Sequence, residues 1–396
     1  MSRIFFSKNL VYNNMKKTFK YRLYPNKKMK KILNQNLKQC RFIYNYILNM
    51  RIEKYKKENI SISKYDINKI ITQLKKENVE LKNIYSQILQ NVSDRVDKAY
   101  KNFFNRVQKG ETPGFPRFKK HNRYRSFTYP QNNGSFKIID DKWLHLSKIG
   151  KIQIKLHRPL YGDIKTCSIK KTNTNKWYVY FTFECDEMTL PTSNKEVGID
   201  MGIKTFAYFS DKEIIENPKT LKKSEKKLKK YQSKFSKEKK GTEKRKKFGK
   251  ILCKIHEKIK NQRDDFLHKS SRYIVNKYQV ICIEDLRVKD MIKKDKSKDN
   301  LEKHKDKLRN KNILDVSWST LTQYLSYKAE EAGRDLILVN PRNTSKTCSG
   351  CGNLVPKGLN DRIHRCDKCG LDIDRDYNAS LNILRLGLES LEVNAS

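Results

Sequence analysis

Four cysteines near the C-terminus have the residue type and the spacing of a metal site. They form two Cys-x-x-Cys pairs, Cys348/Cys351 and Cys366/Cys369, with fourteen residues between the pairs. Four thiolates close a tetrahedral zinc site, and because no coordination position stays open, such a site is structural. Buried or disulfide-bonded cysteines are the alternative. The clustering of these two pairs, while the other five cysteines are scattered, favours zinc.

Three acidic residues in the second half of the chain form a second candidate site. Asp200 lies in an apolar strand pattern, Glu284 ends another, and Asp376 precedes the last helical pattern. A carboxylate in an apolar strand is costly unless a positive partner neutralises it. The order strand-Asp, strand-Glu, helix-Asp is typical of a ribonuclease H-type fold, whose three carboxylates hold two divalent metals at a scissile phosphate. Oxygen ligands favour Mg²⁺ in that role.

Each acid also has a purely structural alternative. Asp200 could accept a hydrogen bond from a turn amide, and Asp376 could cap the last helix. Asp372 or Asp374 could hold metal in place of Asp376, because all three lie in the run Asp-Ile-Asp-Arg-Asp. No one of these acids is specific by itself. Their order, with the cysteine pairs directly upstream of the third acid, is what predicts a nuclease site.

Hydrophobic periodicity predicts the elements that position these residues. Residues 15–25 alternate as a strand, residues 27–108 are mostly helical, and six short strands follow between 117 and 190. Short strands at this spacing predict a small β-barrel, which the N-terminal strand joins, so that the helices form an insertion. The pattern after residue 196 predicts strands at 197–210, 280–286 and 335–340, a Lys-rich helical hairpin at 219–278, a charged flexible loop at 288–312, and helices at 318–329 and 377–388.

The charge of the chain indicates a polyanionic partner. Lys and Arg number 88 against 43 Asp and Glu, a formal net charge of +45 that is spread along the whole sequence. Codon bias toward lysine could raise the charge, but hardly to this extent, so nucleic acid is the expected partner. No apolar run is long enough for a membrane span, and the N-terminus lacks a signal peptide's apolar region. We therefore expect no membrane partner and a cytoplasmic, nucleoid-associated location.

Several motifs together resemble the TnpB family, the RNA-guided nucleases of insertion sequences and relatives of compact type V CRISPR effectors. The motifs are Gly-Ile-Asp200-Met-Gly, Ile-Glu284-Asp-Leu, Thr-Ser-Lys-Thr-Cys348-Ser-Gly-Cys-Gly, Asp-Arg-Asp376-Tyr-Asn-Ala-Ser, Phe19-Lys-Tyr-Arg-Leu-Tyr-Pro and Gly114-Phe-Pro-Arg-Phe-Lys-Lys. One departure is Ser380, where family members commonly have alanine; serine is equally small. The resemblance covers nearly the whole chain after Met15, and the motif set is specific although no single member is.

The resemblance implies a multidomain α+β fold and a function. Asp200, Glu284 and Asp376 would bind catalytic Mg²⁺, and the four cysteines would bind structural Zn²⁺. A transposon-derived guide RNA would pair with double-stranded target DNA beside a short flanking motif, which the protein reads. The implied division is an N-terminal extension (1–14), a β-barrel wedge domain (15–26 and 117–195), a helical recognition domain (27–116), a RuvC-like nuclease domain (196–346 and 371–388), a zinc-finger insertion (347–370) and a tail (389–396).

Two rival functions use the same residues. A DDE-type transposase would join strands with similar carboxylate chemistry, but the cysteine pairs between the second and third acids and the N-terminal barrel speak against it. An RNA-guided DNA-binding regulator would not cut, and the three intact acids speak against that. The RNA-guided endonuclease is therefore the preferred hypothesis.

Overall fold

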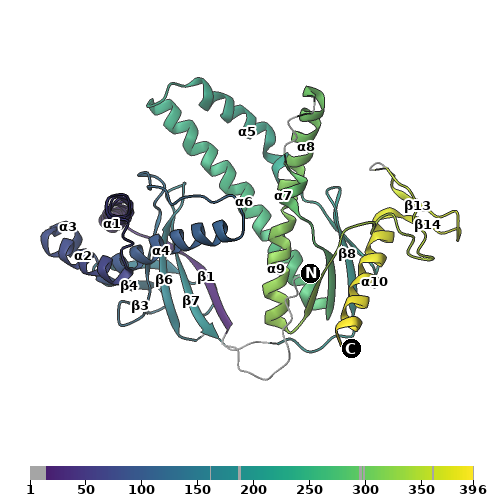
Figure 1. Ribbon diagram of the computed structural model, residues 1–396, viewed down its shortest axis with the longest axis horizontal. Helices are drawn as coiled ribbons and strands as arrows, with labels where there is room; N and C mark the ends of the chain where they lie inside the picture. The colour runs from purple at the N-terminus through teal and green to yellow at the C-terminus, as the bar shows by residue number, and fades with distance from the viewer. Residues whose placement is uncertain are drawn as a thin grey trace. The chain divides into compact units, whose positions relative to one another are not determined.

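The chain forms two compact units in the computed structural model (Figure 1): unit 1, residues 1–186, and unit 2, residues 187–396. The structure describes residues 15–160, 162–185, 189–293, 297, 299–358 and 361–395. The predicted extension at 1–14 lies outside them. Residues 189–195, predicted to end the barrel, instead bond to unit 2, where the Leu190 amide donates to the Ala332 carbonyl at 3.1 Å. The finer division into domains remains a prediction.

Unit 1 is built on one seven-stranded antiparallel sheet in the order β2-β6-β7-β1-β5-β4-β3. The N-terminal strand β1 lies in the middle of this sheet and pairs with β7 and β5, as predicted. Its inward residues Phe19, Tyr21 and Leu23 join the core. The strands are β1 (Met15–Tyr24), β2 (Ser126–Tyr129), β3 (Phe136–Ile139), β4 (Trp143–Leu146), β5 (Gly150–Lys155), β6 (Ile164–Lys171) and β7 (Trp177–Cys185).

The two edges of this sheet approach each other. Tyr129 of the edge strand β2 packs its ring 6.2 Å from the ring of Phe136 on the opposite edge strand β3. The Tyr129 hydroxyl also donates to the Ser147 carbonyl at 2.8 Å, just beyond β4. Aromatic contact across the gap buries both rings, so the sheet curls into a nearly closed barrel.

The predicted helical insertion is present between β1 and β2. Asn26, Ser63 and Asn78 cap the N-termini of the first three helices with their side chains, as short polar side chains do. Apolar faces of these helices share one core with the barrel. The helices are α1 (Lys27–Glu58), α2 (Lys64–Glu77), α3 (Val79–Lys82) and α4 (Ser86–Gln108).

Unit 2 is built on a five-stranded mixed sheet in the order β10-β9-β8-β11-β12. β8, β9 and β10 form an antiparallel meander, whereas β11 runs parallel to both β8 and β12. β11 is buried along its whole length, as expected for a central parallel strand. The strands are β8 (Glu196–Met201), β9 (Thr205–Phe209), β10 (Ile214–Glu216), β11 (Val280–Glu284) and β12 (Asp335–Val339).

Helices cover this sheet and extend from it (Figure 1). α5 and α6 form the predicted Lys-rich hairpin, with Thr242 capping α6. Gly333 ends α9 at a φ of 66°, in the left-handed region that favours glycine. Among the described residues, no helix combines the length and apolarity needed to cross a bilayer. The helices are α5 (Thr220–Lys237), α6 (Glu243–Lys277), α7 (Val288–Met291), α8 (Asn300–Val316), α9 (Trp318–Ala332) and α10 (Arg375–Ala395).

Two predictions about flexible segments were wrong. The stretch 288–312, predicted as a mobile loop, contains α7 and most of α8. Asp315 near the end of α8 pairs with Arg263 of α6 and accepts from the Leu221 amide of α5, which anchors a helix with few apolar residues. The second concerns the predicted tail at 389–396: the last helix, predicted to end at residue 388, continues through Ala395.

Candidate metal centres

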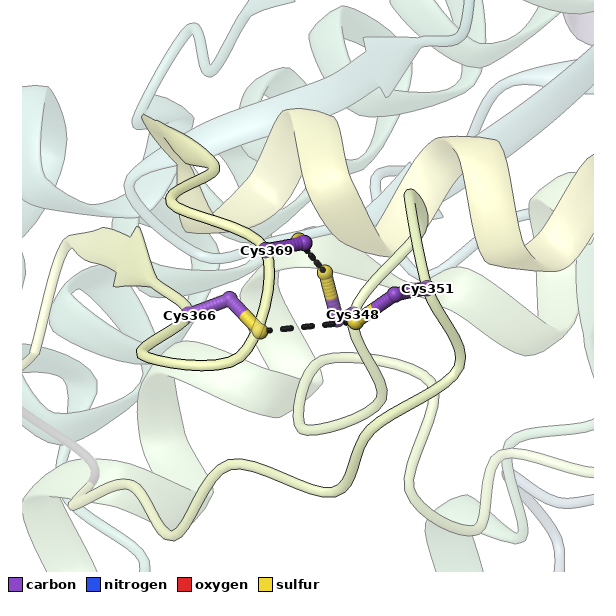
Figure 2. A group of neighbouring side chains, drawn as sticks. All are labelled: Cys348, Cys351, Cys366 and Cys369. Carbon is purple, nitrogen blue, oxygen red and sulfur yellow. Dashed lines mark hydrogen bonds between the residues drawn. The ribbon is translucent and has the colours of Figure 1, made fainter.

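The four cysteines converge although they come from two separate turns. The Cys348 and Cys369 sulfurs lie 3.6 Å apart, and those of Cys351 and Cys366 lie 3.5 Å apart (Figure 2). All four sulfurs lie within 4.8 Å of one another. A tetrahedral zinc site with Zn–S bonds of about 2.3 Å places its sulfurs about 3.8 Å apart. The cluster therefore fits zinc.

The protonation of the thiols also suits a metal. The Cys369 backbone amide is the main cause that lowers the pKa of Cys366, to about 6, against the opposing effect of burial. The pKa of Cys369 is raised: the Leu371 amide lowers it, but the sulfurs of Cys351, Cys348 and Cys366 raise it more. Zinc binding would release the remaining thiol protons, because the thiolate is the ligand.

Tight turns and a small hairpin hold the cysteine pairs. Gly352 and Gly370 follow the two pairs at φ 75° and 73°, and their amides donate to the Cys348 and Cys366 carbonyls at 2.9 and 2.8 Å. Glycine reaches this left-handed region at little cost. The second pair lies between two short strands that the sequence did not predict, β13 (Ile363–Arg365) and β14 (Asp372–Asp374), which pair antiparallel.

Two buried asparagines connect the cysteine module, residues 347–370, to α10, the helix that carries Asp376. The Asn378 side chain accepts from the Ser349 amide at 2.9 Å and donates to the Thr347 carbonyl at 2.8 Å. Asn382 donates to the Thr344 and Thr347 carbonyls at 2.9 and 2.7 Å. Sequence reasoning missed both residues. Their i, i+4 spacing in a helical pattern is the signal that could have revealed them.

Asp200, Glu284 and Asp376 lie in one electrostatic site at the sheet. Asp200 and Glu284 follow the paired residues Ile199 and Ile283 on the adjacent parallel strands β8 and β11. Burial raises the pKa of Asp200 well above its usual value, and the charges of Glu284 and Asp376 raise it further. A cation beside Asp200 would relieve its repulsion with Glu284 and Asp376, so this grouping suits a metal ion.

Glu284 has the smallest exposed fraction of the three acids. It is 8% exposed, and its carboxylate accepts a 2.6 Å hydrogen bond from the Thr344 hydroxyl. Burial raises the pKa of Glu284, while the Thr344 contact opposes that shift. Thr344 lies just before the cysteine module, and its carbonyl binds Asn382. One segment therefore contacts both Glu284 and α10.

The acidic residues in the segment that leads into α10 have different partners. Asp374 accepts from the Asp376 and Tyr377 amides at 2.8 and 3.1 Å and so caps α10. Asp372 pairs with Arg365 at 2.9 Å in the β13–β14 hairpin. Asp376 therefore does not cap the helix, and the structural alternative for it falls away.

The Asp376 carboxylate instead contacts arginine. The Arg375 guanidinium donates to one carboxylate oxygen at 3.0 and 2.8 Å, and Arg362 lies 3.8 Å from the other. Among the described residues, only the four cysteines bring their ligand atoms close enough for one ion. The carboxylates share a site electrostatically, but whether they bind metal stays a prediction.

Three family models match separate parts of the chain. Residues 15–59 match "Helix-turn-helix domain", residues 180–295 match "Probable transposase", and residues 318–383 match "Cas12f1-like, TNB domain". The first description differs from the structure, where residues 15–59 are the barrel strand β1 followed by the single long helix α1. The third match contains all four cysteines and Asp376.

Curated relatives and a solved structure extend these matches to nearly the whole chain. A "Putative RNA-guided DNA endonuclease" of Streptomyces pristinaespiralis is 31% identical, over 96% of this chain and 91% of that protein. A second protein of that description, InsQ of Escherichia coli K12, is 29% identical over 93% and 92%. The protein in "Cryo-EM structure of the Cas12f1-sgRNA-target DNA complex" shares the fold at 14% identity and a TM-score of 0.57, over 94% of this chain and 99% of that one. This chain belongs to the TnpB/IS605 family of transposase-associated proteins.

Proposed function

We propose that the protein is an RNA-guided DNA endonuclease that hydrolyses phosphodiester bonds with the help of bound divalent metal. Two relatives matched over most of their length carry RNA-guided DNA endonuclease in their names. A structure of the same fold is titled as a complex with guide RNA and target DNA. The net charge of +45 suits both partners. The guide would come from transposon RNA, and the target would be double-stranded DNA beside a short motif.

The observation that carries the proposal is the grouping of three acids. Glu284 and Asp376 each raise the pKa of Asp200, although the three residues lie far apart in the sequence. Glu284 is oriented by the Thr344 hydroxyl, and Asp374 fixes the start of α10 from which Asp376 projects. These three residues are the proposed catalytic set. Apart from this set, the four cysteines would hold structural zinc.

The proposed chemistry divides between the carboxylates and the metal. Magnesium would supply Lewis-acid activation of water and stabilisation of the leaving oxygen. Asp200, Glu284 and Asp376 would hold the metal ion and balance its positive charge. Their burial at the sheet would limit access of bulk water and strengthen these electrostatic interactions. No histidine or serine base is required. The reaction would leave a 5′-phosphate or 3′-phosphate end without a covalent enzyme intermediate, because no side-chain nucleophile takes part.

The test combines guide identification with a cleavage assay. The chain is expressed with its own downstream flanking DNA, and RNA that purifies with it is sequenced. A target matched to that RNA should be cut with Mg²⁺ and left intact with EDTA. Asp200→Ala should abolish cleavage but retain RNA and target binding. Retained cleavage by this variant would exclude the proposed site.

The same assay separates the rival functions. A transposase, which the "Probable transposase" match favours, would join cut ends to a second DNA. A regulator would bind the target and leave it uncut with Mg²⁺ present. Absence of a discrete RNA would favour an unguided enzyme over the proposal.

A further inference from the structure

An aromatic cluster at the C-terminal end of α4 is left open to solvent within unit 1. The Phe103 ring lies 5.2 Å from Phe104 and 5.4 Å from Phe115, and the Tyr100 ring lies 6.4 and 5.7 Å from the same two phenylalanines. Phe104 is 55% exposed and Phe115 is 48% exposed. We call Tyr100, Phe103, Phe104 and Phe115 the ring cluster.

The position of the cluster is fixed by the structure beneath it. Asn45 of α1 donates to the Lys119 carbonyl at 3.1 Å and accepts from the Lys119 amide at 2.8 Å. This two-point contact pins the loop that follows α4, the loop from which Phe115 reaches back to Tyr100. The Arg51 guanidinium lies over the Tyr100 ring, 5.5 Å from its centroid. Phe104 and Phe115 are therefore presented on an ordered base.

The surroundings of the cluster are strongly basic. Residues 101–120 include six Lys or Arg and one glutamate. The side chain of Arg106 passes over Gly114, within 3.8 Å of the point where a β-carbon would stand. Flat rings beside flexible cations match a chain of bases joined by phosphates, since rings stack on bases and cations contact the backbone.

Charge speaks against a second copy of the chain as the partner of the cluster. Unit 1 carries 41 Lys or Arg against 13 Asp or Glu, and unit 2 carries 47 against 30. Both units are positive, so a second copy of the chain would bring like charge to this basic surface. A polyanion with planar groups fits better.

We infer that the ring cluster stacks unpaired bases of the target DNA. This inference rests on the proposed function, in which the DNA duplex must open so that a guide can pair with it. A guided enzyme meets a different DNA sequence at every target, and base pairing rather than protein reads it. Stacking suits that task because every base has a π-face. The cluster thus holds opened DNA and reads no sequence.

The test replaces rings by a similar apolar volume in the full-length chain. Phe104→Leu/Phe115→Leu keeps every charge, and the rescue variant Phe104→Tyr/Phe115→Tyr restores the rings. Tyr65→Leu is the matched control, because Tyr65 on α2 is 70% exposed and outside the cluster. The probe is a short single-stranded oligodeoxynucleotide containing 2-aminopurine, whose fluorescence is quenched by stacking.

The leucine double variant should weaken single-strand binding about 5- to 150-fold and lose the quenching. Duplex DNA affinity and the salt dependence should not change, because the phosphate contacts remain. The tyrosine variant should recover binding, and the Tyr65 control should match wild type. If the double variant unfolds, the single leucine variants should show smaller losses of single-strand affinity and of quenching.

Other results would overturn the inference and leave the proposed function standing. Unchanged single-strand affinity, in a variant that still retains guide RNA and cuts, would show that the rings do not stack on DNA. Loss of the purified RNA with unchanged DNA binding would assign the cluster to RNA. A lower melting temperature or altered oligomeric state with normal DNA binding would assign it to a protein contact. A wild-type chain that binds neither RNA nor single-stranded DNA would overturn both proposals.

Discussion

Two acids at the start of α10 stand two residues apart and have different partners. Asp374 bonds to backbone amides of the first turn and so stabilises the helix, and its charge raises the pKa of Asp200 less than that of Asp376 does. The Asp376 carboxylate does not cap the helix, and its charge raises the pKa of Asp200. Position in the sequence did not separate these roles, because either acid could reach the amides or the site. The direction of each side chain decides it.

Asparagine in place of each aspartate distinguishes the two roles. Asp374→Asn keeps a good capping side chain, so stability and cleavage should stay close to wild type. Asp376→Asn removes a proposed metal ligand and should reduce cleavage below detection. Asp374→Ala should lower the free energy of unfolding by about 1 kcal/mol through loss of the cap. If Asp376→Asn still cleaves DNA and Asp374→Asn does not, Asp374 rather than Asp376 is the metal ligand.

Gly198 shows why one position admits only glycine. It lies on β8 two residues before Asp200, and a β-carbon there would overlap the Ser380 carbonyl and the Leu384 amide of α10. Backbone touches backbone at this contact, so no side chain can move away. Gly198→Ala should therefore destabilise the protein by about 1–3 kcal/mol or more, and the shift of α10 should also slow cleavage.

Gly249→Ala on α6 is the matched control for that variant. Its β-carbon would lie 3.2 Å from the ring of Phe235, which is a side chain that can yield. Alanine also favours helix over glycine by up to about 1 kcal/mol. Thermal unfolding should show a loss for Gly198→Ala and little change or a gain for Gly249→Ala. Equal effects would contradict the close packing of α10 on β8.

At the scale of elements, hydrogen bonds join the cysteine module and α10 into one structural unit. Asn378 and Asn382 both donate to the Thr347 carbonyl, and Asn378 also accepts from the Ser349 amide. The Thr344 hydroxyl of the same segment donates to Glu284. Zinc in the cluster would thus stabilise the placement of α10 as well as the module. The module's proposed role is structural, and its effect on the acids passes through these hydrogen bonds.

Cys366→Ser should remove zinc and loosen this structural unit. Structural zinc in isolated finger peptides contributes about 10–16 kcal/mol of apparent binding energy to folding, and the variant would lose part of it. Zinc content and the melting temperature should both fall. Cys253→Ser is the control, because Cys253 is a free, half-buried thiol on α6 away from the cluster. Unchanged zinc content in Cys366→Ser would exclude the predicted ligand.

At the scale of the whole molecule, the dominant property is the net charge of +45. Long basic helices carry much of it, including the α5–α6 hairpin and α1. Such charge supports contacts to phosphate backbone along extended surfaces and gives little sequence discrimination. It also raises the rate at which nucleic acid is encountered.

Nucleic-acid affinity should therefore fall steeply with salt. With six to ten phosphate contacts, affinity drops about 10³- to 10⁵-fold between roughly 50 and 200 mM salt. Titrations of guide RNA at several salt concentrations give the slope, while the melting temperature of the free protein serves as a control for salt effects on folding. A flat response would mean that the charge does not contact phosphate.

The sequence by itself determined much of this protein. Periodicity located the barrel strands, the helical insertion and the Lys-rich hairpin, because burial of one face imposes a repeat of two or 3.6 residues. The cysteine spacing predicted the cluster, since two tight turns place four sulfurs together locally. The prediction of a loop at 288–312 was wrong because α8 is anchored by contacts such as Asp315 with Arg263, which periodicity does not record.

Only the tertiary structure decided how distant residues meet. The parallel pairing of β8 with β11 places Asp200 beside Glu284, and the packing of α10 on Gly198 adds Asp376. The sheet register depends on contacts between segments far apart in the chain. A one-dimensional pattern carries no information on these contacts, because burial and backbone approach are settled only when the whole core packs.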